Sequence, residues 1–100
     1  MATTRLIRYR TKAEHADENE RLVRNVFAEL AEECPEGLHY ATLRLDDGVS
    51  FVHVAVTDGD ENPLTASPAF AAFQADIGER CAEGPTPADA TVIGNFRLLG

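Results

Sequence analysis

The sequence contains no tryptophan, one methionine and only two cysteines in 100 residues, which gives little support for a disulfide-stabilised scaffold. Basic residues are also scarce: nine Lys and Arg stand against 17 Asp and Glu, so the net charge is −8. Because a nucleic-acid backbone requires a cationic surface, we expect no nucleic-acid partner. No long apolar run provides a signal peptide or a membrane span, so we expect a cytoplasmic protein whose Cys34 and Cys81 are free thiols.

The short motifs that identify many enzymes are missing as well. No group of His, Cys, Asp and Glu residues has the spacing of a metal site, and there is no nucleophile elbow, P-loop or dinucleotide fingerprint. We therefore expect no metal and no cofactor.

What the chain does contain is one ordered series of strands and helices, which we predict to form a single domain over residues 1–100. Thr11 is expected to cap the first helix and Ser67 the second, with Pro68 as its first residue. The predicted elements are strand 4–10, helix 13–33, a hairpin over 37–56 that turns at Asp47-Gly48, helix 68–81 and strand 90–99.

This β-α-β-β-α-β order predicts an α+β, ferredoxin-like fold. Two right-handed crossovers place both helices on one face of a four-stranded antiparallel sheet with the strand order 4-1-3-2. We expect both helices to run in the same direction, with Cys34 and Cys81 at one end but too far apart for a disulfide.

The hairpin raises the main functional question, because neither of its two faces suits water. A type I′ turn at Asp47-Gly48 would place residue 44 opposite 51 and residue 42 opposite 53. One face is then aliphatic, with Val52, Val54 and Val56. The other face is mixed, and it consists of Tyr40, Thr42, Arg44, Phe51 and His53. Since the helices cover only one face, we expect a second copy of the chain to cover the other and form a homodimer.

The mixed face carries the candidate site residues. His53 is expected to titrate near physiological pH and to abstract a phenolic or enolic proton, and the alternative explanation is a core histidine satisfied by one hydrogen bond. Tyr40 would orient a substrate or stabilise an oxyanion. Arg8 and Arg44 would hold an anionic group, or form salt bridges with the many carboxylates.

The runs RYRTKAEHADENERLVRNVFAEL, FVHVA and SPAFAAFQADI resemble small members of the dimeric α+β barrel superfamily, most similar to antibiotic biosynthesis monooxygenase-like proteins. The resemblance covers nearly the whole chain in element order and hydrophobic pattern. It implies that two sheets pack face to face and that ligands sit between sheet and helices. The mixed face, with Leu6 and Arg8, would then line the pocket, and the valine face, with Ile7 and Tyr9, would meet the other subunit; the reverse assignment stays open.

The resemblance also implies a function. It favours a cofactor-independent monooxygenase acting on a small aromatic or enolisable molecule, with His53 and Tyr40 as catalytic residues. The implied substrate-binding residues are Arg8, Arg44, Thr42 and Phe51. The lack of tryptophan, together with Leu6 and Gln74 at the positions of haem-contacting residues, disfavours haem degradation. A non-catalytic homodimer that binds a small molecule, or has a purely structural role, is the alternative.

Overall fold

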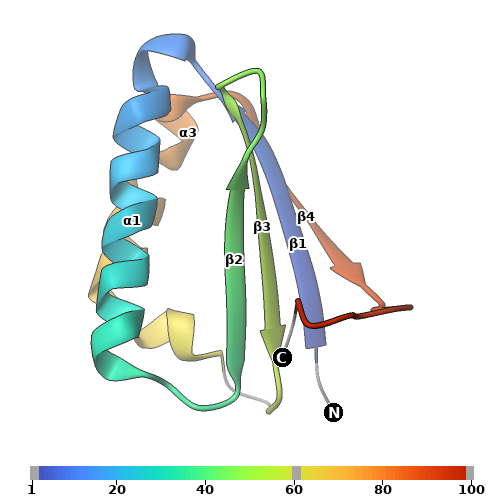
Figure 1. The fold of residues 1–100 in the computed structure, drawn as a ribbon. Coiled ribbons are helices and arrows are strands. Elements are labelled where there is room, and N and C mark those ends of the chain that lie inside the picture. Colours follow the sequence, from blue (N-terminus) through green and yellow to red (C-terminus); the bar gives the residue numbers. More distant parts are fainter. Residues whose placement is uncertain (1–2, 60–61, 99–100) are drawn as a thin grey trace.

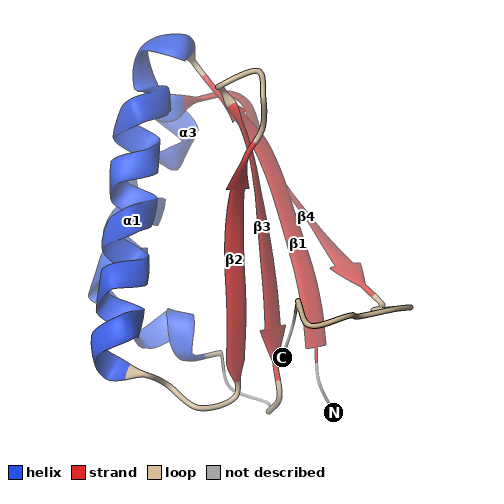
Figure 2. Cartoon of the chain, in the orientation of Figure 1, coloured by secondary structure: helices blue, strands red, loops and turns tan. Residues whose placement is uncertain are grey.

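The computed structural model describes residues 3–59 and 62–98 and contains the predicted ferredoxin-like β-α-β-β-α-β fold (Figure 1). All paired strands are antiparallel, and the sheet order β2-β3-β1-β4 is the predicted order read from the other edge. The helices lie together on one side of the sheet (Figure 2). The elements are β1 (Thr3–Thr11), α1 (Ala16–Glu33), β2 (Leu38–Arg44), β3 (Ser50–Thr57), α2 (Pro68–Ala75), α3 (Ile77–Arg80) and β4 (Cys81–Ala90), with 3-10 helices η1 (Ala13–His15) and η2 (Pro63–Ala66).

The β2-β3 hairpin has the predicted register but a different turn. Arg44 lies opposite Phe51 and Thr42 lies opposite His53, as expected. Of the two central residues only Gly48 has a positive φ, at 77°, so the turn is not type I′. Instead, the Asp47 carboxylate accepts hydrogen bonds from the backbone N–H groups of Val49 and Ser50 at 2.9 and 2.8 Å. These bonds hold the loop without a second positive φ.

The first helix begins later than predicted, and Thr11 does not cap it. Thr11 is the last residue of β1, and its hydroxyl donates to the Val49 carbonyl at 3.1 Å, so it is not available to α1. The short helix η1 then leads into α1 at Ala16. The helix ends at Glu33, as predicted, where Cys34 takes a left-handed conformation with φ 44°.

The start of the second helix is confirmed, but the prediction for the last strand is wrong. The Ser67 hydroxyl accepts from the Phe70 N–H at 3.0 Å and Pro68 is the first helical residue. The last strand is Cys81–Ala90, whereas residues 91–98 of the predicted strand 90–99 form no strand and Leu99 lies outside the described residues. Pro85 and Pro87 are residues that usually interrupt a strand. Both lie within β4, and an edge strand tolerates proline.

The two sides of β1 are also the reverse of the resemblance-based assignment. Ile7 lies opposite His53 and Tyr9 opposite Phe51, so these side chains share the mixed face beneath the helices. Leu6 and Arg8 lie on the bare face of the sheet with the valines. The alternation of charge explains this result, because arginines at 8 and 10 alternate with Tyr9 and are exposed while Tyr9 is buried.

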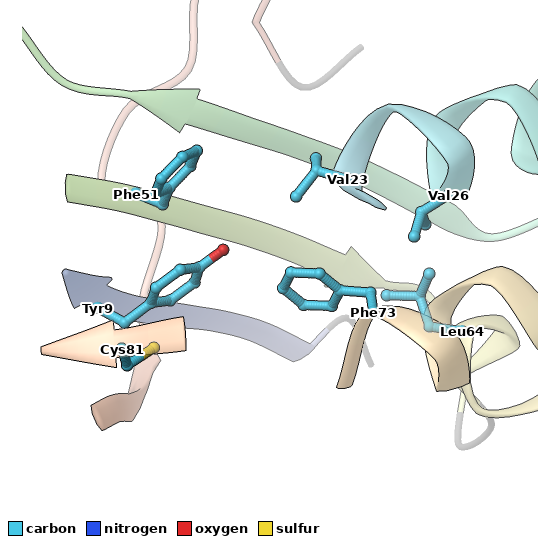
Figure 3. Packing of buried hydrophobic residues seen from close by; sticks show 7 residues of the cluster. All are labelled: Tyr9, Val23, Val26, Phe51, Leu64, Phe73 and Cys81. Atoms are coloured by element: carbon cyan, nitrogen blue, oxygen red, sulfur yellow. The ribbon is translucent and has the colours of Figure 1, made fainter. Parts of the chain in front are cut away.

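The core therefore forms between the mixed face and the helices. Figure 3 shows its members, which are Tyr9, Val23, Val26, Phe51, Leu64, Phe73 and Cys81. The rings of Tyr9 and Phe51 stack with their centroids 5.5 Å apart, and both side chains are almost completely buried. Among the described residues, no helix has both the length and the apolar character needed to cross a membrane.

The two cysteines are free thiols, but they lie at opposite ends of α1. Cys34 follows the last residue of α1, whereas Cys81 pairs with Thr11, just before the chain enters that helix. The prediction that both cysteines lie at one end is wrong because the two helical segments do not run in the same direction. α1 leads away from the end of the sheet where Thr11 lies, whereas α3 leads back to that end (Figure 1).

Their different burial predicts different reactivity. Cys34 is exposed, while Cys81 is 8% exposed and burial raises the pKa of its thiol. We expect a thiol reagent at pH 8 to modify one cysteine in the native protein and both in denaturant. A Cys34→Ser variant should show no rapid native labelling. Rapid labelling of two thiols in the folded protein would contradict the burial of Cys81.

Candidate functional site

His53 lies at the centre of the helix-facing side of β3, where strand alternation turns it toward the core. Its side chain is buried among aromatic rings, with centroids at 5.4 Å from Tyr9, 5.8 Å from Tyr40 and 5.3 Å from Phe73. The predicted orientation, on the same face as Tyr40 and Phe51 and toward the helices, agrees with the structure.

Both ring nitrogens of His53 are bonded to hydroxyl groups. Nε2 lies 2.8 Å from the Tyr9 hydroxyl. Nδ1 lies 2.5 Å from the Tyr40 hydroxyl and 3.1 Å from the Thr42 hydroxyl. A ligand that bonds to the Tyr40 hydroxyl would therefore be connected through it to the imidazole.

Two further residues extend this network, and sequence reasoning did not find them. Asn19 of α1 donates from Nδ2 to the Tyr9 hydroxyl at 2.8 Å, and Arg80 of α3 donates from Nε to the Asn19 carbonyl oxygen at 3.2 Å. Both side chains are buried. A sequence signal existed for Asn19, because it is the one polar residue among the buried positions of α1, which are Ala16, Asn19, Val23 and Val26. Arg80 gave no comparable signal.

Burial changes the expected proton chemistry of the site. Desolvation lowers the pKa of His53 to about 4, so the prediction of titration near physiological pH is wrong. Desolvation also raises the pKa of Tyr40 to about 12 and that of Tyr9 above its ordinary value. At neutral pH the site consequently holds a neutral imidazole between neutral phenols.

A cavity of about 980 Å³ opens beside this network, between the sheet and the α2 side of the helical layer. Its polar wall includes Tyr9, Tyr40 and His53, and its apolar wall includes Phe70 and Phe73. The other lining residues are Thr3, Arg5, Ile7, Ala55, Thr57, Gly59, Asn62, Leu64, Thr65, Ser67, Ala71, Gln74, Ile77, Pro85 and Asp89. Arg5 pairs with Asp89 at 3.5 Å where both are exposed. The cavity thus combines an aromatic wall with hydroxyl donors.

A second, more open cavity of about 730 Å³ lies between α1 and β2. Tyr40 contributes to both cavities, whereas three of the four predicted substrate-binding residues, Thr42, Arg44 and Phe51, line only the second. The Arg44 guanidinium donates to the carboxylates of Asp17 and Glu20 at 3.2 and 3.0 Å. The salt-bridge explanation for Arg44 therefore agrees with the structure.

The sequence-predicted residues do not form a single cluster. His53, Tyr40 and Thr42 are brought together by hydrogen bonds, and Phe51 packs beside Tyr9 in the core. Arg8 lies on the bare face and lines neither cavity, because odd and even positions of β1 point to opposite sides. Within residues 3–59 and 62–98, no three His, Cys, Asp or Glu side chains gather in a way that could hold a metal ion.

Comparison with known proteins connects this fold to one group. No family model and no curated protein matches the chain. Among solved structures, Rv0793 from Mycobacterium tuberculosis is 15% identical, with a TM-score of 0.75 over 95% of this chain and 98% of its own. SnoaB, a cofactor-independent oxygenase from Streptomyces nogalater, is 18% identical, with a TM-score of 0.69 over 96% of this chain and 97% of its own. A dimeric ferredoxin-like protein of unknown function from Jannaschia sp. is 15% identical, with a TM-score of 0.68 over 92% of this chain and 100% of its own.

These similarities establish the fold class that the sequence resemblance implied. The chain has the fold shared by antibiotic biosynthesis monooxygenase-like proteins and dimeric ferredoxin-like proteins, some of which have no known function. At 10–18% identity the similarity concerns the backbone, and the activity has to be argued from the side chains of this chain.

The lowered pKa of His53 predicts a pH dependence of stability. The unfolded chain takes up a proton near the ordinary pKa of 6.5, but the folded chain resists it until about 4. Stability is therefore complete above pH 6.5 and falls as the pH drops toward 4. Between pH 7 and 5 we expect His53 to account for a loss of about 2 kcal/mol of unfolding free energy.

A His53→Gln variant, measured by urea unfolding at both pH values, should lose that part of the pH dependence. His15→Gln, at an exposed site, is the matched control and should retain it. Identical pH slopes for His53→Gln and the unaltered protein would show that His53 has an ordinary pKa in the fold.

Proposed function

We propose that this protein is a small cofactor-independent monooxygenase that acts on an aromatic or enolisable molecule in the main cavity. The observation that carries the proposal is the hydroxyl of Tyr40, a residue on the wall of an aromatic cavity, joined through one buried neutral histidine to the hydroxyl of Tyr9. The similarity in fold to an oxygenase that needs no cofactor supports the same chemistry.

The dimensions of the cavity suit such a molecule. Its volume of about 980 Å³ is at the upper end of the range of roughly 300–1,000 Å³ typical of small-molecule pockets. The rings of Phe70 and Phe73, with centroids 5.9 Å apart, provide a surface on which a flat ligand can stack. The substrate class is therefore a planar molecule with at least one hydroxyl or carbonyl oxygen near Tyr40.

The site would act by stabilising an oxyanion. A substrate that releases a proton to solvent water becomes an enolate or phenolate, and a hydroxyl donor beside the charged oxygen stabilises it; the released proton is taken up again when water is formed in the oxidation. The electron-rich anion then reacts with O2 without a metal. In the simplest balanced form a CH2 group and O2 give a C=O group and water, and the substrate itself supplies the electrons. His53 would relay a proton between the two tyrosines, since both its nitrogens bond to hydroxyls.

Oxygen uptake tests this proposal. With 1,8-dihydroxyanthrone as the enolisable probe and a metal chelator present, we expect enzyme-dependent O2 consumption of one mole per mole of ketone formed. Tyr40→Phe should reduce the rate about 100-fold because it removes one oxyanion donor. The stacking of its ring on Phe27, at 4.9 Å between centroids, should preserve the fold.

Thr65→Val is the matched control, because it removes a hydroxyl that is exposed, is bonded to the Asn62 carbonyl and takes no part in the hydrogen bonds of His53. Its rate should be unchanged. An equal loss in both variants, or no binding of any planar phenol by the unaltered protein, would overturn the proposal.

A non-catalytic binding protein is the second candidate, and one observation favours it. The pKa of about 4 makes His53 a weak base, and its two nitrogens already bond to protein hydroxyls. If phenols bind without O2 uptake, and if Tyr40→Phe weakens that binding, the site belongs to a carrier or sensor of the same class of molecule.

We also propose that two copies associate through the bare sheet face. This face presents Leu6, Ala41, Leu43, Val52 and Val54, and the Leu43 side chain is 51% exposed. An apolar strip of this kind is unfavourable in water, and a second copy offers the same surface in return. The dimeric ferredoxin-like protein with the same fold supports the proposal.

Sedimentation at low micromolar concentration should give twice the chain mass of 10.9 kDa. Val54→Asp places a charge in the middle of the face and should shift the protein to the monomer. Ala13→Asp adds the same charge in the exposed turn before α1 and should leave the dimer intact. A stable monomer for the unaltered chain would exclude this interface.

A further inference from the structure

Arg80 is an unusual residue for a core, because its charge is buried and no carboxylate among residues 3–59 and 62–98 pairs with it. The side chain is 4% exposed. Its partners within the described part of the chain are the Asn19 carbonyl oxygen, the Phe73 carbonyl at 2.5 Å and the face of the Phe73 ring at 5.5 Å. Burial of an arginine without an opposite charge is costly, so a role beyond packing is expected.

The first effect of Arg80 is to fix the orientation of Asn19. A guanidinium group can only donate hydrogen bonds, so the end of the Asn19 amide that faces it must be the oxygen. The NH2 end then faces Tyr9 and must donate to its hydroxyl oxygen at 2.8 Å. Asn19 is fully buried, which leaves its amide no alternative partner in water.

The second effect concerns the hydrogen of the Tyr9 hydroxyl. Its oxygen already accepts from Asn19, and His53 Nε2 is its other hydrogen-bond partner among the described residues. If Nε2 carried the proton, Tyr9 would accept twice and its own hydrogen would be buried without an acceptor, at a cost of about 1–3 kcal/mol. Tyr9 therefore donates to Nε2, and the proton of the neutral ring is on Nδ1.

The third effect concerns the hydroxyl of Tyr40, a residue that lines the cavity. With its proton on Nδ1, the His53 ring donates to the Tyr40 hydroxyl oxygen at 2.5 Å. The Thr42 hydroxyl oxygen, 3.1 Å from Nδ1, is a second acceptor for the same proton. The hydroxyl hydrogen of Tyr40 is then not needed by His53 and is free to bond a ligand oxygen in the cavity. With the opposite tautomer, the Tyr40 hydroxyl would donate this hydrogen to His53 Nδ1.

We propose that Arg80 and Asn19 are positioning residues that hold His53 in the Nδ1–H tautomer and so direct the Tyr40 hydroxyl toward the ligand. Their importance for turnover rests on the proposed function, but the tautomer itself is a property of the protein without ligand. The two proposals can therefore fail separately.

Nuclear magnetic resonance of protein labelled with 15N in its histidine rings tests the assignment at pH 7. Protonated and unprotonated ring nitrogens differ in their 15N chemical shifts. The signals that disappear in the His53→Gln variant are those of His53. In the unaltered protein we expect a protonated Nδ1 and an unprotonated Nε2. A protonated Nε2 would overturn the proposal directly, whatever the variants do.

Asn19→Asp is the sharpest variant because it keeps the shape and turns a donor into an acceptor. One carboxylate oxygen pairs with Arg80 and the other accepts the Tyr9 hydrogen, so His53 should change to the Nε2–H tautomer. Arg80→Met should give a mixture of both forms, since the Asn19 amide is then free to turn. Arg24→Met, at an exposed arginine that pairs with Glu20, is the control and should keep Nδ1–H.

If folded Asn19→Asp retains Nδ1–H, the proposal is wrong. Should both buried variants fail to fold, the tautomer of the unaltered protein still decides it. If the tautomers behave as expected and no planar phenol binds, the positioning network stands and the proposed function fails.

Discussion

The burial of one imidazole under the helices imposes the main constraint on this structure. His53 lies in a layer of aromatic rings, where a polar ring without partners would cost stability. Three hydroxyl groups from two other strands surround it, and α1 and α3 supply the amide and the guanidinium that orient one of them. No buried side-chain nitrogen or oxygen in the described part of the chain lacks a hydrogen-bond partner. The site is therefore built into the core, and Tyr9 belongs to both.

This overlap explains why the chemistry of the site differs from that of an exposed histidine. In water the imidazole would exchange protons near neutral pH, but the core stabilises only its neutral form. A neutral ring between two hydroxyls can pass a proton from one to the other without becoming charged. The positive charge of the network sits on Arg80, at the far end from Tyr40, where it favours negative charge along the chain of bonds.

The sequence predicted the fold well because its strongest signals are periodic. Strand order, hairpin register and the Ser67 cap all follow from alternation, turn residues and short-range capping. The last strand was misplaced since Pro85 and Pro87 suggest a break, and only the tertiary structure shows that they occupy a sheet edge. The family resemblance places Ile7 and Tyr9 on the wrong face of the sheet, whereas the alternation of arginine with Tyr9 along β1 favours the face that they occupy.

The site could be predicted only in part. His53, Tyr40 and Thr42 share one hairpin, so a local register was enough to bring them together. Arg80 is 61 residues from Asn19 in the chain, and nothing short of the folded structure shows that they meet. The pKa of His53 likewise depends on the helices above it, which the sequence of β3 does not encode.

The composition of β4 also limits how molecules of this protein can aggregate. An exposed strand edge normally offers backbone N–H groups on which another chain can extend the sheet. β4 is such an edge, yet Pro85 and Pro87 have no N–H group, and the acidic side chains of Glu83 and Asp89 accompany them. Pairing with a further strand, and so growth into a continuous intermolecular sheet, is therefore disfavoured at this edge.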